Sequence, residues 1–218
     1  MGWALIGVGE FTNILAIIAG MMVWGLSSRP IRLLTIFLVL NLLTDISAIV
    51  MGRLVGHNLI LLNIYELIEY PIIAVIFSYW LDGKARIFTL LSAPVFPVLC
   101  VFLHLSGIED LFGSGSYFTT IKGLLVGLIV VRTLYSLMIH SKGSPIQRTA
   151  PFWITIGTFF LVTCGVAVYA AIPEQITVEL WIIHIICVII AYLLYIRGFW
   201  CLRGKESNTQ EVLQPSPS

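Results

Sequence analysis

Residues 63–71 read Asn63-Ile64-Tyr65-Glu66-Leu67-Ile68-Glu69-Tyr70-Pro71 and lie inside a longer apolar stretch, Leu59–Leu81. An ionisable side chain in hydrocarbon is costly, so it normally faces the protein interior or a hydrated cavity. Glu66 and Glu69 are three residues apart and Tyr70 follows Glu66 by four, so all three share one broad side of a helix. Pro71 removes a backbone donor and predicts a kink. We expect this stretch to be a membrane helix and one wall of a polar site.

The composition of the chain excludes an ordinary soluble globule. Of its 218 residues, 59% are hydrophobic and 11% are charged, and the mean hydropathy is +1.01. Average soluble chains carry about 25% charged residues. The net charge is +1, and no basic patch for nucleic acid is present.

A membrane-spanning helix needs about 20 mostly apolar residues. The sequence contains seven such stretches, at residues 3–24, 31–51, 59–81, 87–105, 117–139, 151–172 and 178–200. Pro30 and Pro151 suit first-turn positions, where a missing N–H costs nothing. The fold class predicted is therefore an all-α integral membrane protein, with a seven-helix bundle over residues 1–202. Residues 203–218 are polar and are predicted to be a disordered cytoplasmic tail.

The distribution of Lys and Arg predicts the orientation, because cytoplasmic loops are enriched in both. One side of the bundle receives Arg29, Arg32, Lys84, Arg86, Lys142, Arg148, Arg203 and Lys205. The other side receives Arg53 alone, together with Glu109, Asp110, Glu174 and Glu179. The N-terminus is therefore expected outside and the C-terminus in the cytoplasm.

With this topology, the helical rise of about 1.5 Å per residue places several polar groups in one depth band that opens outward. The candidate ligand-binding residues are Glu10, Asn13, Asn41, Asp45, Asn63, Tyr65, Glu66, Glu69, Tyr70 and His184. The three asparagines also suit hydrogen bonds between helices. Burial and mutual repulsion disfavour ionisation of Asp45, Glu66 and Glu69 together, so some should be protonated near neutral pH. Lys122 and Arg132 are expected to extend toward the bilayer surfaces. Arg132 lies further from its helix end, so pairing with a buried carboxylate is the alternative for it.

Signals for metal or enzyme chemistry are weak. A zinc site needs three or four His, Cys, Asp or Glu ligands at coordination distance. Asp45, Glu66, Glu69 and His184 could supply them only if their three helices adjoin. The sequence lacks His-x-x-x-His, His-Glu-x-x-His, Gly-x-Ser-x-Gly and Gly-rich phosphate loops.

Two pairs of small residues predict close helix approach: Gly123-x-x-x-Gly127 and Ala16-x-x-x-Gly20. Such pairs pack helices within one chain or join two copies in a homo-oligomer.

Several phrases resemble a family of small, uncharacterised seven-helix bacterial inner-membrane proteins. They are Leu43-Thr44-Asp45, Ile64-Tyr65, Ile68-Glu69-Tyr70, Pro151-Phe152-Trp153 and Leu180-Trp181-Ile182-Ile183-His184. By this resemblance, Tyr65, Glu69 and His184 match recurrent family positions, whereas Asp45 stands where the family tends to carry Glu. Glu66 departs from the family pattern. The resemblance implies a bacterial inner-membrane location and no stated activity.

The order of the stretches is also similar in topology to sugar-efflux and PQ-loop-like carriers. Residues 61–66 can be aligned with residues 179–184, and Pro30 with Pro151, at nearly the same offset. This pattern suggests two parallel three-helix units joined by the fourth helix, with Glu66 and His184 facing each other.

The function expected from these features is that of a membrane-embedded binding protein, either a transporter or a sensor. Its outward-opening pocket of carboxylates and His would hold a small cation, an amine or an amphipathic ligand. One alternative is an intramembrane metal-dependent lipid hydrolase. Another is a structural subunit whose carboxylates a membrane partner neutralises.

Overall fold

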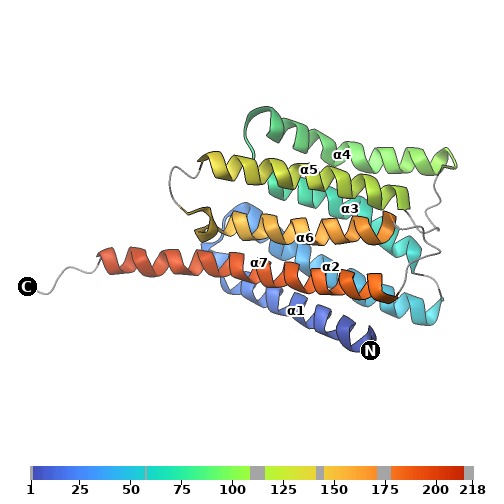
Figure 1. The fold of residues 1–218 in the computed structure, drawn as a ribbon, viewed down its shortest axis with the longest axis horizontal. Helices are drawn as coiled ribbons and strands as arrows, with labels where there is room; N and C mark the ends of the chain where they lie inside the picture. Colours follow the sequence, from blue (N-terminus) through green and yellow to red (C-terminus); the bar gives the residue numbers. More distant parts are fainter. Residues whose placement is uncertain (1, 57, 109–115, 141–144, 171–177, 214–218) are drawn as a thin grey trace, which may run out of the picture.

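The computed structural model describes residues 2–56, 58–108, 116–140, 145–170 and 178–213. Over these ranges the chain is all-helical, with short 3-10 turns at Trp24–Leu26 and Ile146–Arg148. The α-helices are α1 (Gly2–Met22), α2 (Arg29–Leu54), α3 (Leu59–Ser78), α4 (Gly83–Leu105), α5 (Ser116–His140), α6 (Ala150–Ala170) and α7 (Val178–Leu213). They lie side by side, and the two termini point to opposite ends of the bundle (Figure 1). The predicted all-helical fold is confirmed.

Six of the helices are long and apolar enough to cross a membrane, judged by length and composition. The remaining helix, α6, has a shorter apolar segment, Ala150–Val166. The outer surface agrees with this: Val95, Val98 and Phe102 on α4 are 60%, 69% and 62% exposed. Large apolar side chains at such exposure suit lipid as the surrounding solvent and not water. The structure therefore indicates an integral membrane protein.

The boundaries of α3 and α4 differ from the predicted ones. α3 ends at Ser78 and not at Leu81, and α4 begins at Gly83 and not at Ile87. The connection is tight because Gly83 adopts a φ of +53°, a conformation that a residue without Cβ takes at little cost. Pro30 and Pro151 both occupy the second position of their helices, so the predicted first-turn placement is confirmed.

The last helix is longer than its predicted span. α7 contains 36 residues and continues to Leu213, whereas the disordered tail was expected to begin at residue 203. No proline interrupts residues 203–213, and Pro215 follows shortly afterwards, so the local sequence permits this extension. Residues 214–218 lie outside the described part of the chain. The same holds for the loop charges Glu109, Asp110, Lys142 and Glu174.

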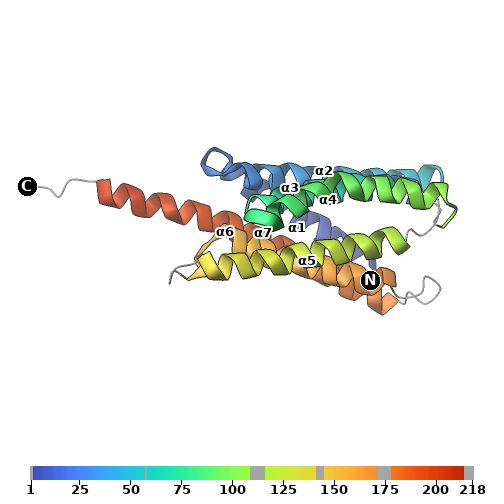
Figure 2. The same ribbon diagram turned by 90° about the horizontal axis from the view of Figure 1, so that it is seen from above.

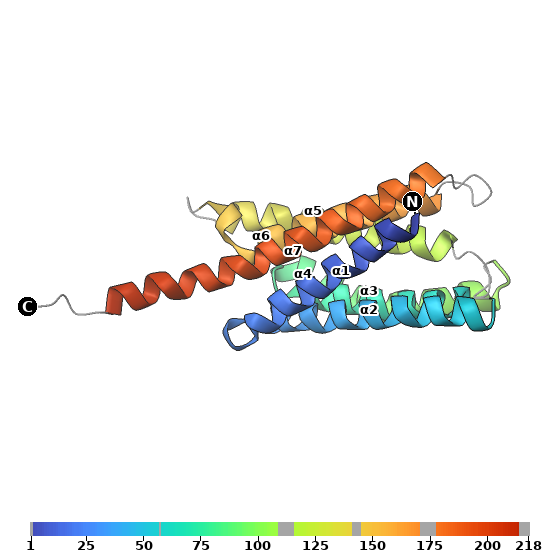
Figure 3. The same cartoon turned by 90° about the horizontal axis from the view of Figure 1, so that it is seen from below.

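Six helices close into a ring in which α1 packs on α2, α2 on α3, α3 on α5, α5 on α6, α6 on α7, and α7 on α1. α4 packs on the outside, mainly against α3. α2, α3 and α4 lie on one side of the bundle and α5, α6 and α7 on the other (Figure 2). α1 runs obliquely between α7 and α2 (Figure 3). The ring has a two-fold pattern of neighbours. If α1, α2 and α3 exchange places with α5, α6 and α7, respectively, each pair of helices in contact is replaced by another pair that is also in contact.

Three of the four small residues noted in the sequence pack closely within the chain; at the fourth, Gly127, no described atom of another helix lies within 4 Å of an added methyl group. Gly20 on α1 lies against Thr35 of α2 and Phe199 of α7, and Gly123 on α5 lies against Val166 of α6. Ala16 is fully buried. Gly20 and Gly123 therefore serve close helix approach inside one bundle.

We predict that Gly20→Ala destabilises the bundle. The added methyl group would meet Oγ1 of Thr35, would lie 2.9 Å from its Cγ2 and would lie 3.2 Å from Phe199 Cζ. Thr35 is stiff at χ1 and its hydroxyl donates to the Ile31 carbonyl at 3.1 Å, so it cannot rotate away freely. Overpacking of this kind costs roughly 1–3 kcal/mol. The unfolding midpoint of the detergent-solubilised protein measures the effect.

The matched control is Gly7→Ala on the same helix, because no described atom lies within 4 Å of the added methyl group there. Equal midpoints for Gly20→Ala and Gly7→Ala would contradict the packing described.

Candidate functional site

A cavity of about 650 Å³ lies inside the ring of six helices. Its lining comes from α1, α2, α3, α5, α6 and α7, and α4 contributes none of the described lining residues. Gly52, Arg53 and Asn58 line it near the connection between α2 and α3. Tyr192, near the middle of α7, and Ile73, in the second half of α3, line it further in. The cavity therefore extends from the end of the bundle that holds the N-terminus toward its centre.

Most of the polar residues singled out from the sequence line this cavity. They are Glu10 on α1, Asn41 and Asp45 on α2, Tyr65, Glu66 and Glu69 on α3, and His184 on α7. Within each helix, the lining residues lie on one face because they are spaced by about one helical turn. On α3 the lining residues are 62, 65, 66, 69 and 73, which recur at spacings of three and four. Asp45, Glu69 and His184 thus come from three separate helices to one hollow.

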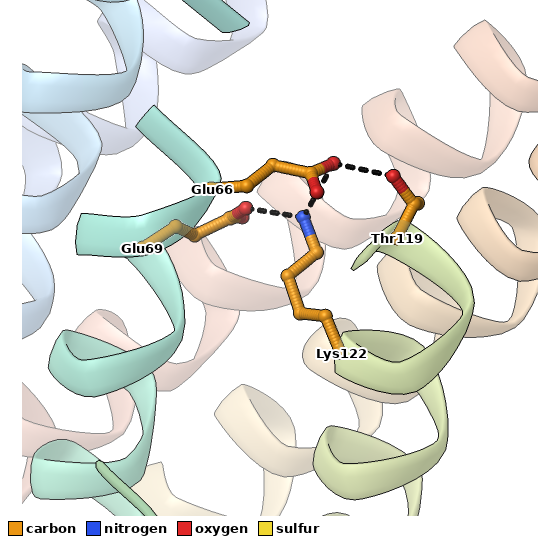
Figure 4. Close-up of polar contacts among 4 residues, drawn as sticks. All are labelled: Glu66, Glu69, Thr119 and Lys122. Atoms are coloured by element: carbon orange, nitrogen blue, oxygen red, sulfur yellow. Dashed lines mark hydrogen bonds and ion pairs between the residues drawn. The ribbon is translucent and has the colours of Figure 1, made fainter. Parts of the chain in front are cut away.

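Lys122 on α5 reaches into the same cavity and bridges two of the carboxylates (Figure 4). Its Nζ lies 2.6 Å from Glu69 Oε2 and 3.2 Å from Glu66 Oε1. Thr119, one turn earlier on α5, donates a hydrogen bond of 2.7 Å to the same Glu66 oxygen. The three charged side chains are only 13–16% exposed. Lys122 was expected to extend toward the bilayer surface; in the structure it forms buried ion pairs.

Pairing with Lys122 was not predicted because neighbouring helices are not visible in one sequence. Buried charges require partners, so a lysine in one apolar stretch and two carboxylates in another were the sequence signal that could have indicated this pairing. Arg132, further along α5, is exposed and lies over the Tyr135 ring, 5.1 Å from its centroid.

The remaining carboxylates of the cavity have no such cation. Among the described residues, no ion pair involves Glu10 or Asp45. Asp45 lines the same cavity as Glu10 and Glu69. Glu10 Oε2 and the Tyr65 hydroxyl are buried and have no hydrogen-bond partner among the described residues. This side of the cavity therefore retains two carboxyl groups without a cation partner and unused hydrogen-bonding capacity among the described residues.

A hydrogen bond ties the acidic side to the opposite half of the ring. Asn41 Nδ2 on α2 donates to the Tyr192 hydroxyl on α7 at 2.9 Å. Tyr192 also lies near Asp45 and Tyr195. The amide thus acts between helices, as an asparagine at this depth is expected to do.

Tyr70, Asn13 and Asn63 lie outside the cavity lining. Tyr70 is fully buried against α4, where its hydroxyl donates to Ser92 Oγ at 2.6 Å and its ring packs on Phe96. Successive residues turn by about 100° on a helix. Tyr70 is therefore rotated away from the α3 residues that face the cavity. Asn13 is fully buried, and neither of its amide atoms has a described partner.

The part of the cavity formed by α6 and by the adjoining face of α7 is mostly apolar. Its lining includes Leu161, Val162 and Val166 from α6 and Ile185 and Val188 from α7. The cavity therefore presents one charged wall and one hydrocarbon wall to whatever it holds.

The residues considered for a metal are not grouped for one. Within the described ranges, no three His, Cys, Asp or Glu side chains come together as metal ligands. Asp45, Glu66, Glu69 and His184 share the cavity but do not form such a group. Lys122 stands between Glu66 and Glu69, where a bound cation would otherwise sit.

Comparison with known proteins found no match: no family model, no curated protein and no solved structure is significantly similar to the chain. The site must therefore be interpreted from its own chemistry.

We predict strong energetic coupling between Lys122 and Glu69. Lys122→Met leaves two carboxylates without their cation, and such a change costs roughly 3–5 kcal/mol when the pair is buried. Glu69→Gln should cost less, since Lys122 keeps Glu66. The double variant should recover part of the loss, with a coupling energy of roughly 1–3 kcal/mol. Equilibrium unfolding in detergent of the four proteins measures this cycle, and additive effects would show that the bridge is not a stabilising unit.

Proposed function

We propose that all seven helices span the membrane, with the N-terminus outside and the C-terminus in the cytoplasm. Arg29, Lys84, Arg148 and Arg203 gather near the end of the bundle where α7 leaves it, which supports this orientation. α6 is 21 residues long, sufficient for a span of about 20. The resemblance noted in the sequence further supports a bacterial inner membrane. In this orientation the cavity opens to the outside.

We further propose that the protein binds a small cationic ligand in this cavity, an amine with an apolar body, and acts as a transporter or sensor for it. The observation that carries this proposal is the charge of the lining. Four carboxylates line the cavity against two basic side chains, Lys122 and Arg53. A bound cation favours ionisation of a buried carboxyl group, and in a low-dielectric hollow the resulting ion pair is stronger than it would be in water.

The shape and the second wall of the cavity support an amphipathic ligand. Its volume of about 650 Å³ falls within the range of about 300–1,000 Å³ that is typical of small-molecule sites. The apolar residues from α6 and α7 would cover a hydrocarbon portion while the ammonium group meets carboxylates on α1 and α2. Tyr65 would add a hydrogen-bonding group, and His184 borders the same space.

The arrangement of the ring supports transport in particular. The two three-helix groups, α1–α3 and α5–α7, have matching neighbour relations and enclose the site between them. Many transporters place their substrate at the interface of two such repeats. Uptake into proteoliposomes would distinguish a transporter from a sensor.

The alternatives receive less support. A metal-dependent hydrolase needs a ligand group that the described residues do not assemble. The alternative of a subunit whose carboxylates are neutralised by a partner chain has less support, because Lys122 of the chain itself already pairs with two of them.

We predict that linear alkylamines raise the unfolding midpoint of the purified protein, and that Asp45→Asn and Glu10→Gln weaken this effect. Loss of a charge-assisted hydrogen bond should reduce affinity by about tenfold or more. Thermal shift in detergent measures the unfolding midpoint, and calorimetric titration in detergent measures the amine affinity.

The control for this experiment is Asp82→Asn. Asp82 is a carboxylate at the opposite end of the bundle, 77% exposed and 3.6 Å from His140. Its removal should leave amine binding unchanged. Amine affinities that do not respond to Asp45→Asn and Glu10→Gln would reject the proposed site.

The orientation predicts which positions an impermeant thiol reagent can reach in intact cells. Val55→Cys, in the connection between α2 and α3, should be labelled, since Val55 is 62% exposed. Asp82→Cys should be labelled only after permeabilisation. Labelling of Asp82→Cys but not of Val55→Cys in intact cells would show that the orientation is the opposite of the proposed one.

A further inference from the structure

Lys122 occupies a position that a ligand's ammonium group would otherwise take. Its Nζ contacts one oxygen of Glu66 and one of Glu69, and Thr119 completes the polar contacts of Glu66 Oε1. Two carboxylates of the cavity are therefore already served by a cation that the chain itself provides. The other two, Glu10 and Asp45, form no ion pair among the described residues.

The two pairs of carboxylates also belong to different parts of the ring. Glu66 and Glu69 lie on α3 and are held from α5, whereas Glu10 and Asp45 lie on α1 and α2. Both pairs line one continuous cavity. Glu66 Oε2 and Glu10 Oε2 are buried and have no hydrogen-bond partner among the described residues, so each pair keeps an oxygen for a donor.

We propose that Lys122 is a specificity-determining residue, which restricts the cavity to ligands with a single ammonium group by acting as its second, tethered cation. This inference rests on the proposed function. In the wild type, a ligand ammonium binds at Glu10 and Asp45, and a second ammonium at Glu66 and Glu69 meets the charge of Lys122. Without that charge, the cavity offers two acidic pairs, Glu10 with Asp45 and Glu66 with Glu69, and suits a linear diamine. The apolar wall then covers the methylene chain.

The test compares binding of linear monoamines and diamines of matched chain length to wild type and to Lys122→Met. We expect the wild type to favour the monoamines. In Lys122→Met the ratio of diamine to monoamine affinity should rise by about tenfold or more, since one charge-assisted contact is gained and one repulsion is lost. Calorimetric titration in detergent measures the ratio.

Two further variants keep the test decisive. Lys122→Met with Glu69→Gln retains one vacant carboxylate, and it should show the same change of preference if the single variant does not fold. Lys122→Met with Glu66→Gln and Glu69→Gln has neutral side chains at all three positions, so it should not gain diamine affinity. Arg132→Met removes an exposed cation from the same helix and should keep the wild-type ratio.

The outcomes separate this inference from the proposed function. A rise in the ratio that requires a vacant Glu66 or Glu69 supports the inference. Wild-type binding of amines with the same ratio in every Lys122 variant overturns the role of Lys122 alone. Failure of the wild type to bind any amine overturns the proposed function itself.

Discussion

The ion pairs of Lys122 with Glu66 and Glu69 are the constraint on which the rest of the structure depends. Isolated charges at this burial would be very unfavourable, so each of these side chains requires the other two. Because the acids lie on α3 and the base on α5, the requirement holds these two helices together. The contact between α3 and α5 is one of the places where the α1–α3 and α5–α7 halves meet; α1 against α7 and the Asn41–Tyr192 hydrogen bond are others. The same interaction therefore joins the two halves of the ring. It also divides the cavity carboxylates into one pair that has a cation and one pair that has none among the described residues.

The cavity that results is asymmetric in a way that has chemical consequences. Acidic groups on α1, α2 and α3 face hydrocarbon side chains on α6 and α7. One acidic pair is compensated by the chain and the other is not, so the site combines a region of fixed ion pairing with a region of available charge. In a low-dielectric interior such differences are large compared with those on a soluble surface. A ligand with an ammonium group and an apolar body is complementary to both walls.

Prediction from the sequence succeeded where a single helix carries the information. Residues at spacings of three and four share one side of a helix, so the common position of Glu66 and Glu69 on the cavity face was expected from their spacing. The same reasoning included Tyr70, four residues from Glu66, but the structure places Tyr70 against Ser92 on α4. Residues four apart differ by a rotation of about 40° around the helix axis. At the edge of the cavity face this rotation is enough to turn Tyr70 from the cavity toward α4.

The sequence by itself determined that the chain is helical, that most of its helices suit a bilayer, and that acidic groups lie within apolar stretches, because length and hydropathy are local properties. Only the tertiary structure decided which helices adjoin. It placed Lys122 between two glutamates, put α4 outside the ring, and left Glu10 and Asp45 without a cation among the described residues. The physical reason is that ion pairing depends on distances of a few ångströms between helices far apart in the chain, and hydrophobic periodicity carries no record of those distances.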